Sequence, residues 1–229
     1  VQDYIDAFTP LLEDGKDIIC FTITDTLSGS FQSAMSAKQI LEENYTQRKI
    51  YIENSYAATG SQYLIVREAA RMQQSGYDID AIHSFVQKAK IDSRIFFVVG
   101  TLTHLEKGGR IGKVAALSGS ILNIKPLIVL ANGEINKAGL ARSRKKAMLK
   151  LSELTKNYIT QNHFSISDFT FTIGTTNTPE EIPTFTEILK SDLPDMEMIE
   201  PFQIGATIAT HTGPMTLGVC MNKKFECYL

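Results

Sequence analysis

Short apolar runs alternate along the first half of the chain with longer segments in which apolar residues recur every three or four positions. The short runs predict strands at residues 17–23, 50–54 and 94–100. The periodic segments predict helices at residues 4–12, 30–44, 60–74 and 80–90. Parallel strands need such helical crossovers between them. The alternation therefore predicts an α/β protein whose first part contains a parallel sheet covered by helices.

The pattern changes after Gly109. Two apolar runs, 127–131 and 134–138, flank Asn132-Gly133, which is a strong hairpin signal. Further elements are predicted as a helix at 142–161, a strand at 169–175, a helix that begins at Pro179, and strands near 196–200 and 217–221. This half predicts a mixed-sheet α/β domain, and the change of pattern places a domain boundary near residues 91–100. We therefore expect two domains, 1–94 and 95–229.

The bulk composition narrows the class of protein. The chain has 229 residues, 43% of them hydrophobic, and a net charge of −2, so no global field favours nucleic acid. Cys20, Cys220 and Cys227 form no CxxC pair, which argues against a zinc or redox motif and fits a reducing cytoplasm. No apolar run approaches the length of a membrane span. Because the chain opens on a helix without a preceding strand, we expect a missing N-terminal segment and an incomplete first domain.

Three segments, 24–34, 107–111 and 205–214, are rich in glycine and in small hydroxylated or basic residues. Ser28 follows the first predicted strand and precedes a helix, where unsatisfied N–H groups attract anions. The segments together predict an anion site built from hydroxyls and backbone N–H groups. The simpler alternatives stay open: Ser28 or Ser30 caps its helix, and His211 is a loop histidine bound to the backbone. Residues 115–122 could line an apolar slot or only pack tightly.

Positive charge predominates between residues 107 and 150, which contain ten basic residues and one acidic residue, Glu134. Such a surface could steer an acidic partner or bind phosphates, or it could be a solvated helix face. Nucleic acid is not expected, because no aromatic residues interleave with the bases.

The ordered motifs Leu27–Ala34, Lys107–Ile111, Leu122–Pro126 and Thr210–Pro214 resemble those of the DegV family, bacterial fatty-acid-binding proteins also called FakB. The resemblance implies a two-domain α/β fold with a long-chain fatty acid in a cleft between the domains. One position departs from the family, whose Asp-Ser after the second strand is here Asn54-Ser55.

The resemblance also implies roles for residues and partners. The bound acid would be phosphorylated to an acyl phosphate by an ATP-dependent fatty acid kinase, which supplies phospholipid synthesis, and the chain itself would be a carrier without a cofactor, not an enzyme. We expect a cytoplasmic protein, with transient contact to a membrane surface. The expected ligand-binding residues are Ser28, Gly29, Ser30, Ser55, Arg110, Ile111, His211 and Thr212. The residues expected to dock the kinase are Arg142, Arg144, Lys145 and Lys146.

Two other function classes remain at this point. A serine and a histidine could belong to a hydrolase of lipids or esters, although Ser28 lacks the Gly-x-Ser-x-Gly elbow and no aspartate stands out to orient His211. A phosphate- or RNA-binding module using the basic segment is the third class.

Overall fold

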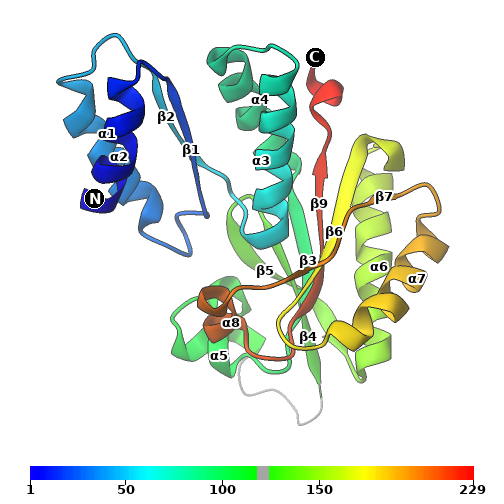
Figure 1. Cartoon of the computed structure of the whole chain (residues 1–229). Coiled ribbons are helices and arrows are strands. Elements are labelled where there is room, and N and C mark those ends of the chain that lie inside the picture. Colours follow the sequence, from blue (N-terminus) through cyan, green and yellow to red (C-terminus); the bar gives the residue numbers. More distant parts are fainter. Residues whose placement is uncertain (118–123) are drawn as a thin grey trace.

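The computed structural model describes residues 1–117 and 124–229, and these residues form two sheets (Figure 1). The smaller sheet pairs β1 (Ile18–Thr22) and β2 (Ile50–Asn54) in parallel. The larger sheet has seven strands in the order β5-β4-β3-β9-β6-β7, and β8 also pairs with β6. An α/β architecture with one parallel and one mixed sheet confirms the predicted fold class.

The larger sheet is assembled from distant parts of the chain. Its strands are β3 (Arg94–Val98), β4 (Lys125–Ala131), β5 (Glu134–Ala141), β6 (Phe169–Thr175), β7 (Glu197–Met198), β8 (Phe202–Gln203) and β9 (Leu217–Lys223). β9 is antiparallel to both of its neighbours, β3 and β6, whereas β7 and β8 run parallel to β6. The last strand in sequence therefore lies in the middle of the sheet. The hairpin at Asn132-Gly133 is confirmed, with φ of 52° and 80° at the two turn residues.

Helices cover both sheets. They are α1 (Gln2–Glu13), α2 (Ser30–Glu42), α3 (Thr59–Gln74), α4 (Ile79–Asp92), α5 (Thr103–Lys107), α6 (Arg144–Gln161), α7 (Ile182–Asp192) and α8 (Ala206–Thr212). Short 3₁₀ helices are η1 (Gly112–Leu117), η2 (Ile166–Asp168), η3 (Pro179–Glu181) and η4 (Phe225–Tyr228). In Figure 1, α3 and α4 lie between the two sheets: α3 contacts β9 and β6, and α4 contacts β1, β2 and β9. The division at residues 94/95 stays a prediction.

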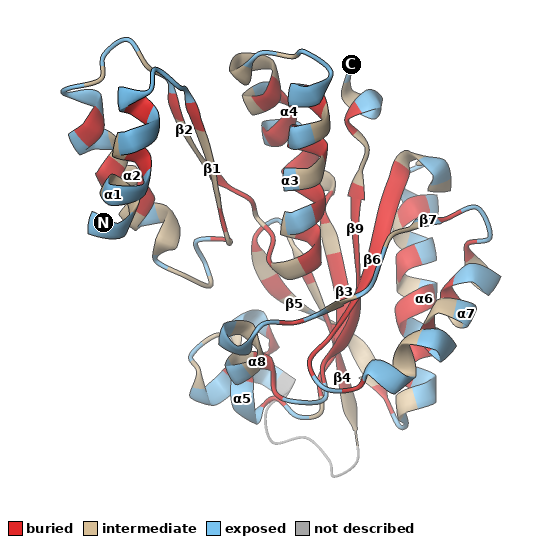
Figure 2. Ribbon diagram, viewed as in Figure 1, coloured by how far each residue is buried: buried red, intermediate tan, exposed pale blue. Residues whose placement is uncertain are grey.

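The two faces of the larger sheet differ sharply. One face packs against α6 and α7 and forms the largest core, whose central side chains are fully buried (Figure 2). Phe96, Phe171 and Val219 belong to this core. Alternate residues of the same strands point to the opposite face. That face contributes Ile95, Phe97 and Cys220 to a second, smaller cluster.

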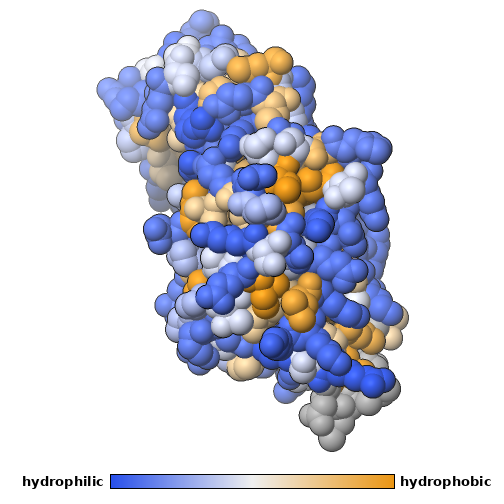
Figure 3. Space-filling model, turned by 90° about the vertical axis from the view of Figure 1, so that its right-hand side faces the viewer, coloured by the Kyte–Doolittle hydropathy of each residue, from blue (hydrophilic) through white to orange (hydrophobic). Residues whose placement is uncertain are grey.

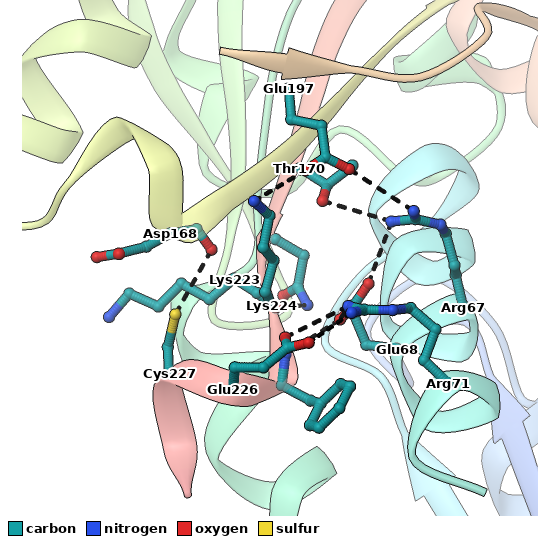
Figure 4. A network of polar contacts seen from close by, with 12 residues as sticks. Arg67, Glu68, Arg71, Asp168, Thr170, Glu197, Lys223, Lys224, Glu226 and Cys227 are labelled. Atoms are coloured by element: carbon teal, nitrogen blue, oxygen red, sulfur yellow. Dashed lines mark hydrogen bonds and ion pairs between the residues drawn. The ribbon is translucent and has the colours of Figure 1, made fainter. Parts of the chain in front are cut away.

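A network of ion pairs joins the last described residues to α3 (Figure 4). Glu68 is only 1% exposed and accepts hydrogen bonds from Arg67, Arg71 and the backbone N–H of Phe225. Arg71 also pairs with Glu226 of η4. A carboxylate this deeply buried requires such partners. The network therefore fixes the C-terminal half of α3 against η4.

The alternative that His211 is a loop histidine is wrong, because residues 206–212 form α8. Of the small-residue segment 115–122, Ala115 and Ala116 are exposed, and positions 118–122 lie outside the described residues. Among the helices described, none combines the length and the apolar character that crossing a bilayer requires.

Candidate binding cavity

A cavity of about 840 Å³ lies between the segment that joins β1 to α2 and the open face of the larger sheet. Its walls come from five parts of the chain: residues 23–30, the start of α3, the sheet face, residues 105–110, and the segment 200–212. In Figure 1 this last segment crosses in front of the sheet from β7 to α8. A volume of this size is typical of a site for a small organic ligand.

Small side chains on the sheet leave the room for this cavity. Gly218 and Cys220 of β9 and Thr172 and Gly174 of β6 line it, and they alternate with large residues that face the packed core. Ile95 and Phe97 of β3 complete an apolar wall. The alternation of large and small residues in β6 and β9 therefore builds a solid core on one face and a hollow on the other.

Ser28, Ser30, Arg110 and His211 line one part of the cavity, which we call its polar end. Ser28 lies just before α2, where its Oγ accepts the N–H of Ser30 at 3.2 Å and lies 2.8 Å from the Ser30 hydroxyl. The first turn of α2 presents its remaining N–H groups and the positive end of its dipole at this place. Hydroxyls and a helix N-terminus together can hold an anion.

Arg110 stands beside this turn. Its Nε donates to the carbonyl of Leu27 at 3.1 Å and its Nη1 to the carbonyl of Gly108 at 2.7 Å. Within the described residues no carboxylate forms an ion pair with Arg110. A guanidinium has five N–H donors, so donors remain for a ligand. The charge of Arg110 thus lies at the polar end without a neutralising partner from the described chain.

His211 of α8 lies on the other side of Gly108. A Cβ at position 108 would collide with the His211 ring, so only glycine permits this approach. Among the described residues the buried Nδ1 of His211 has no hydrogen-bond partner. This nitrogen faces the Gly108 backbone, because it is the ring atom that a Cβ at position 108 would strike first.

The cavity brings together five of the eight predicted ligand-binding residues, namely Ser28, Ser30, Arg110, His211 and Thr212. The other three do not line it. Gly29 is the N-cap of α2 with φ of −73°, a backbone conformation open to any residue. The Ser55 hydroxyl is bonded within its own turn to Ala57, and Ile111 packs against the smaller hydrophobic cluster. Their part in ligand binding stays a prediction.

Most of the other residues that line the cavity were not predicted from the sequence, and Cys220 and Phe202 are two of them. Cys220 of β9 is buried against the start of α3. Burial raises the pKa of the Cys220 thiol to about 11, although the N–H groups of Gly60 and Ser61 and the hydroxyl of Thr59 oppose this. Phe202 of β8 is the second. The cavity could have been predicted from the small residues that alternate with large ones in β6 and β9. No sequence pattern indicates Phe202 as a wall residue.

The basic segment is partly engaged within the molecule. Arg144 binds Glu181 through two nitrogens and donates to the carbonyl of Met215 at 2.7 Å; the two charged side chains are 16% and 17% exposed. Burial alone would raise the pKa of the Glu181 carboxyl, but the hydrogen bonds and charge of Arg144, with Thr178, lower it. Arg142, Lys145 and Lys146 are exposed. Figure 3 shows the side of the molecule that carries α6 and α7, where hydrophilic residues predominate.

The fold and the cavity define a class: an α/β protein with an internal site that is apolar along a sheet and polar at one end. In the part of the chain that the structure describes, no three His, Cys, Asp or Glu side chains gather into a metal site.

The chain belongs to the DegV family, whose model, described as that of uncharacterised proteins, matches residues 1–224. A DegV domain-containing protein of Clostridium perfringens is 33% identical over 218 residues, which is 94% of this chain and 73% of the relative.

Solved structures of the family share the fold. A stearic-acid-binding protein of Eubacterium ventriosum is 33% identical, with a TM-score of 0.91 over 99% of this chain and 77% of its own. A fatty-acid-binding DegV protein of Thermus thermophilus is 26% identical, with a TM-score of 0.85 over 97% and 76% of the two chains. The structural neighbours are thus fatty-acid-binding proteins.

Proposed function

We propose that this protein binds a long-chain fatty acid, with the acyl chain along the sheet and the carboxylate at the polar end. The observation that supports the proposal is the lining of the cavity, in which Ser28, Arg110 and His211 lie close together beside an apolar sheet face. An acyl chain of about 15 methylenes gains on the order of 12 kcal/mol on leaving water. Hydroxyls, N–H groups and a guanidinium offset the cost of burying its carboxylate.

The relatives support this assignment. The Eubacterium ventriosum structure is described as a stearic-acid-binding protein, and it is 33% identical to this chain over a match that covers 99% of this chain. A ligand of the same class would fill the cavity here.

We extend the proposal to what happens to the acid. The protein presents the carboxylate to a cytoplasmic kinase, which transfers the γ-phosphoryl group of ATP to a carboxylate oxygen and leaves an acyl phosphate and ADP. The carrier needs no nucleophile for this reaction. In support, the Ser28 hydroxyl is engaged with Ser30, a pairing that does not activate it as a histidine would.

Extraction and titration test the binding. Organic solvent should release a long-chain acid from the purified protein, and mass spectrometry identifies it. Ser28→Ala should weaken binding by about 1–3 kcal/mol, because a buried carboxylate loses a hydrogen bond. Ser36→Ala is the matched control, since the Ser36 hydroxyl lies on α2 and bonds to the Gln32 carbonyl. If no acid is released and none is taken up on titration, the proposal fails. Ester hydrolysis that disappears in Ser28→Ala would instead establish a hydrolase.

Charge reversal tests the kinase surface. Lys145→Glu with Lys146→Glu should slow phosphorylation of the bound acid and flatten its salt dependence, because exposed charges act mainly on the encounter rate. Arg144 is unsuitable for this test, since its reversal would break the pair with Glu181. Lys88→Glu on α4, another exposed lysine, is the control. Equal rates and salt slopes for all three proteins would contradict this docking surface.

A further inference from the structure

The turn that precedes Ser28 is hydrogen-bonded to the tip of the β4–β5 hairpin. Thr24 is fully buried, and its hydroxyl donates to the Gly133 carbonyl at 3.0 Å. The Thr26 hydroxyl donates to the same carbonyl. A Cβ at Gly133 would lie 2.8 Å from Thr24 Oγ1, so the absence of a side chain there permits this close approach. Two hydroxyls of one turn therefore converge on a carbonyl that belongs to the larger sheet's hairpin.

The backbone around this contact is fixed at further points. The Leu27 N–H donates to the Thr24 carbonyl at 3.1 Å, which closes the turn, and the Thr24 N–H donates to the Ala57 carbonyl at 2.9 Å. The Gly133 N–H donates to the Tyr56 carbonyl at 3.2 Å. The hairpin tip and the segments that follow the two parallel strands are therefore joined into one hydrogen-bonded unit.

The same turn carries part of the polar end of the cavity. Ser28 directly follows Leu27, whose carbonyl accepts the Nε–H of Arg110 at 3.1 Å. The turn is thus held at its start by the hairpin tip and at its end by the guanidinium. A hydrogen bond weakens steeply when its distance or angle departs from the optimum. A shift of the turn would therefore move Ser28 relative to Arg110 and weaken the grip of both on one carboxylate.

We propose that Thr24 is a positioning residue, whose hydrogen bond to the hairpin tip sets the place of the Ser28 hydroxyl beside Arg110. The inference rests on the proposed fatty-acid function and adds a residue that acts on the head group without touching it. Among the described residues, the lining of the cavity includes Ile23 and Leu27 but not Thr24. Loss of the Thr24 hydroxyl should therefore impair recognition of the carboxylate and leave the burial of the acyl chain unchanged.

Two ligands with the same chain and different head groups test this assignment. Tetradecanoic acid and tetradecan-1-ol are titrated into delipidated protein, and the ratio of the two affinities reports on recognition of the carboxylate. In Thr24→Val the acid affinity should fall about tenfold and the ratio about fivefold, because hydrogen bonds to a charged group are stronger than those to a neutral one. Thr24→Ser keeps a hydroxyl and should keep the wild-type ratio.

Thr22→Val is the matched control. Thr22 is also buried, and its hydroxyl donates to the Glu53 carbonyl at 3.3 Å within the smaller sheet. This variant should lose stability without a change in the ratio, since its hydroxyl does not bond to the turn before Ser28. If Thr24→Val does not fold, Gly133→Ala takes its place, because the added methyl group would press on Thr24 Oγ1 from the hairpin side and should also lower the ratio.

A double substitution shows whether Thr24 acts through Ser28. In the Ser28→Ala background, Thr24→Val should lower the acid affinity less than it does in the wild type, because the hydroxyl that it positions is already gone. Changes at independent sites add. Full additivity of the two substitutions would therefore overturn the assignment.

The outcomes are distinguishable. If the wild type does not bind the acid, the proposed function fails. If the wild type binds the acid and Thr24→Val keeps the ratio of acid to alcohol affinity, the positioning assignment is wrong and the function stands. An equal fall of the ratio in Thr22→Val would also contradict the assignment, because the loss would then follow from general destabilisation.

Discussion

The two faces of the larger sheet are built from the same strands and serve opposite purposes. In β3, Phe96 points to the face covered by α6 and α7, and Phe97 points to the cavity. In β9, Val219 faces the core while Gly218 and Cys220 face the cavity. The first face is filled with large side chains, and the second is kept open by small ones. Stability and binding capacity are thus divided between two sides of one structure.

This division has an energetic consequence. Side chains on the packed face make van der Waals contacts on all sides. Side chains that border the cavity lack these contacts on the side that faces the empty space. The binding face therefore depends on its ligand for contacts that the core face already has.

Truncation of the two adjacent phenylalanines is the strongest test of the comparison. Phe96→Ala should lower the free energy of unfolding by about 3–5 kcal/mol, as expected for a fully packed aromatic. Phe97→Ala should cost less in the delipidated protein, because its side chain borders a cavity. Denaturant unfolding of both variants measures the difference. Equal losses would mean that the two faces are packed alike.

Ligand removal should produce the next largest effect. Saturation with fatty acid at about a hundredfold excess over the dissociation constant should stabilise the protein by about 2.7 kcal/mol. Phe96→Ala should retain this increment, while Phe97→Ala should lose part of it along with affinity. Thermal unfolding with and without the acid provides the measurement, and an unchanged increment in Phe97→Ala would contradict the assignment of that side chain to the binding face.

Two isosteric substitutions compare the loss of one hydrogen bond on the cavity side with the loss of one on the core side, and the expected energies are smaller. Thr172→Val on the cavity face removes the hydrogen bond to the Glu200 carbonyl, and Thr155→Val in α6 removes one to the Leu151 carbonyl. Each should cost about 0.5–1.5 kcal/mol of stability. Only Thr172→Val should also change fatty-acid affinity, because its bond holds the segment that carries Phe202. Matching effects on binding would show that this segment needs no such anchor.

The smallest effect concerns the Cys220 thiol, whose pKa burial raises to about 11. At neutral pH the thiol is protonated in both folded and unfolded protein, so Cys220→Ala should show no pH-dependent difference there. Above pH 9 the unfolded thiol ionises first, and the wild type should lose stability relative to the variant as the pH approaches 11. Unfolding at stepwise pH measures this loss. A difference that instead grew toward acid pH would contradict a buried, neutral thiol.

Local sequence patterns predicted many of the secondary-structure elements. Features that depend on contacts between distant segments could not be predicted in this way. Asn132-Gly133 specifies its hairpin through local backbone preferences, and Ser28 lies at the predicted strand–helix junction. Helix α8 escaped prediction because it is short, flanked by glycines and rich in threonine, so little local signal remains. The partner of Arg144 is Glu181, which a count of charges between residues 107 and 150 cannot include. The Phe202 ring packs against Gly60 of α3 and Gly174 of β6, a contact between distant segments that no local pattern predicts.

The central position of β9 has a consequence for biosynthesis. Until residues 217–223 leave the ribosome, the larger sheet exists as two unjoined parts, with β3 and β6 presenting open edges. Open edges are templates for pairing with other chains, and pairing between distant segments is intrinsically slow. Nascent chains of this protein therefore pass through an aggregation-prone stage that only the last strand ends, and chaperones that shield strand edges would act on it during that interval.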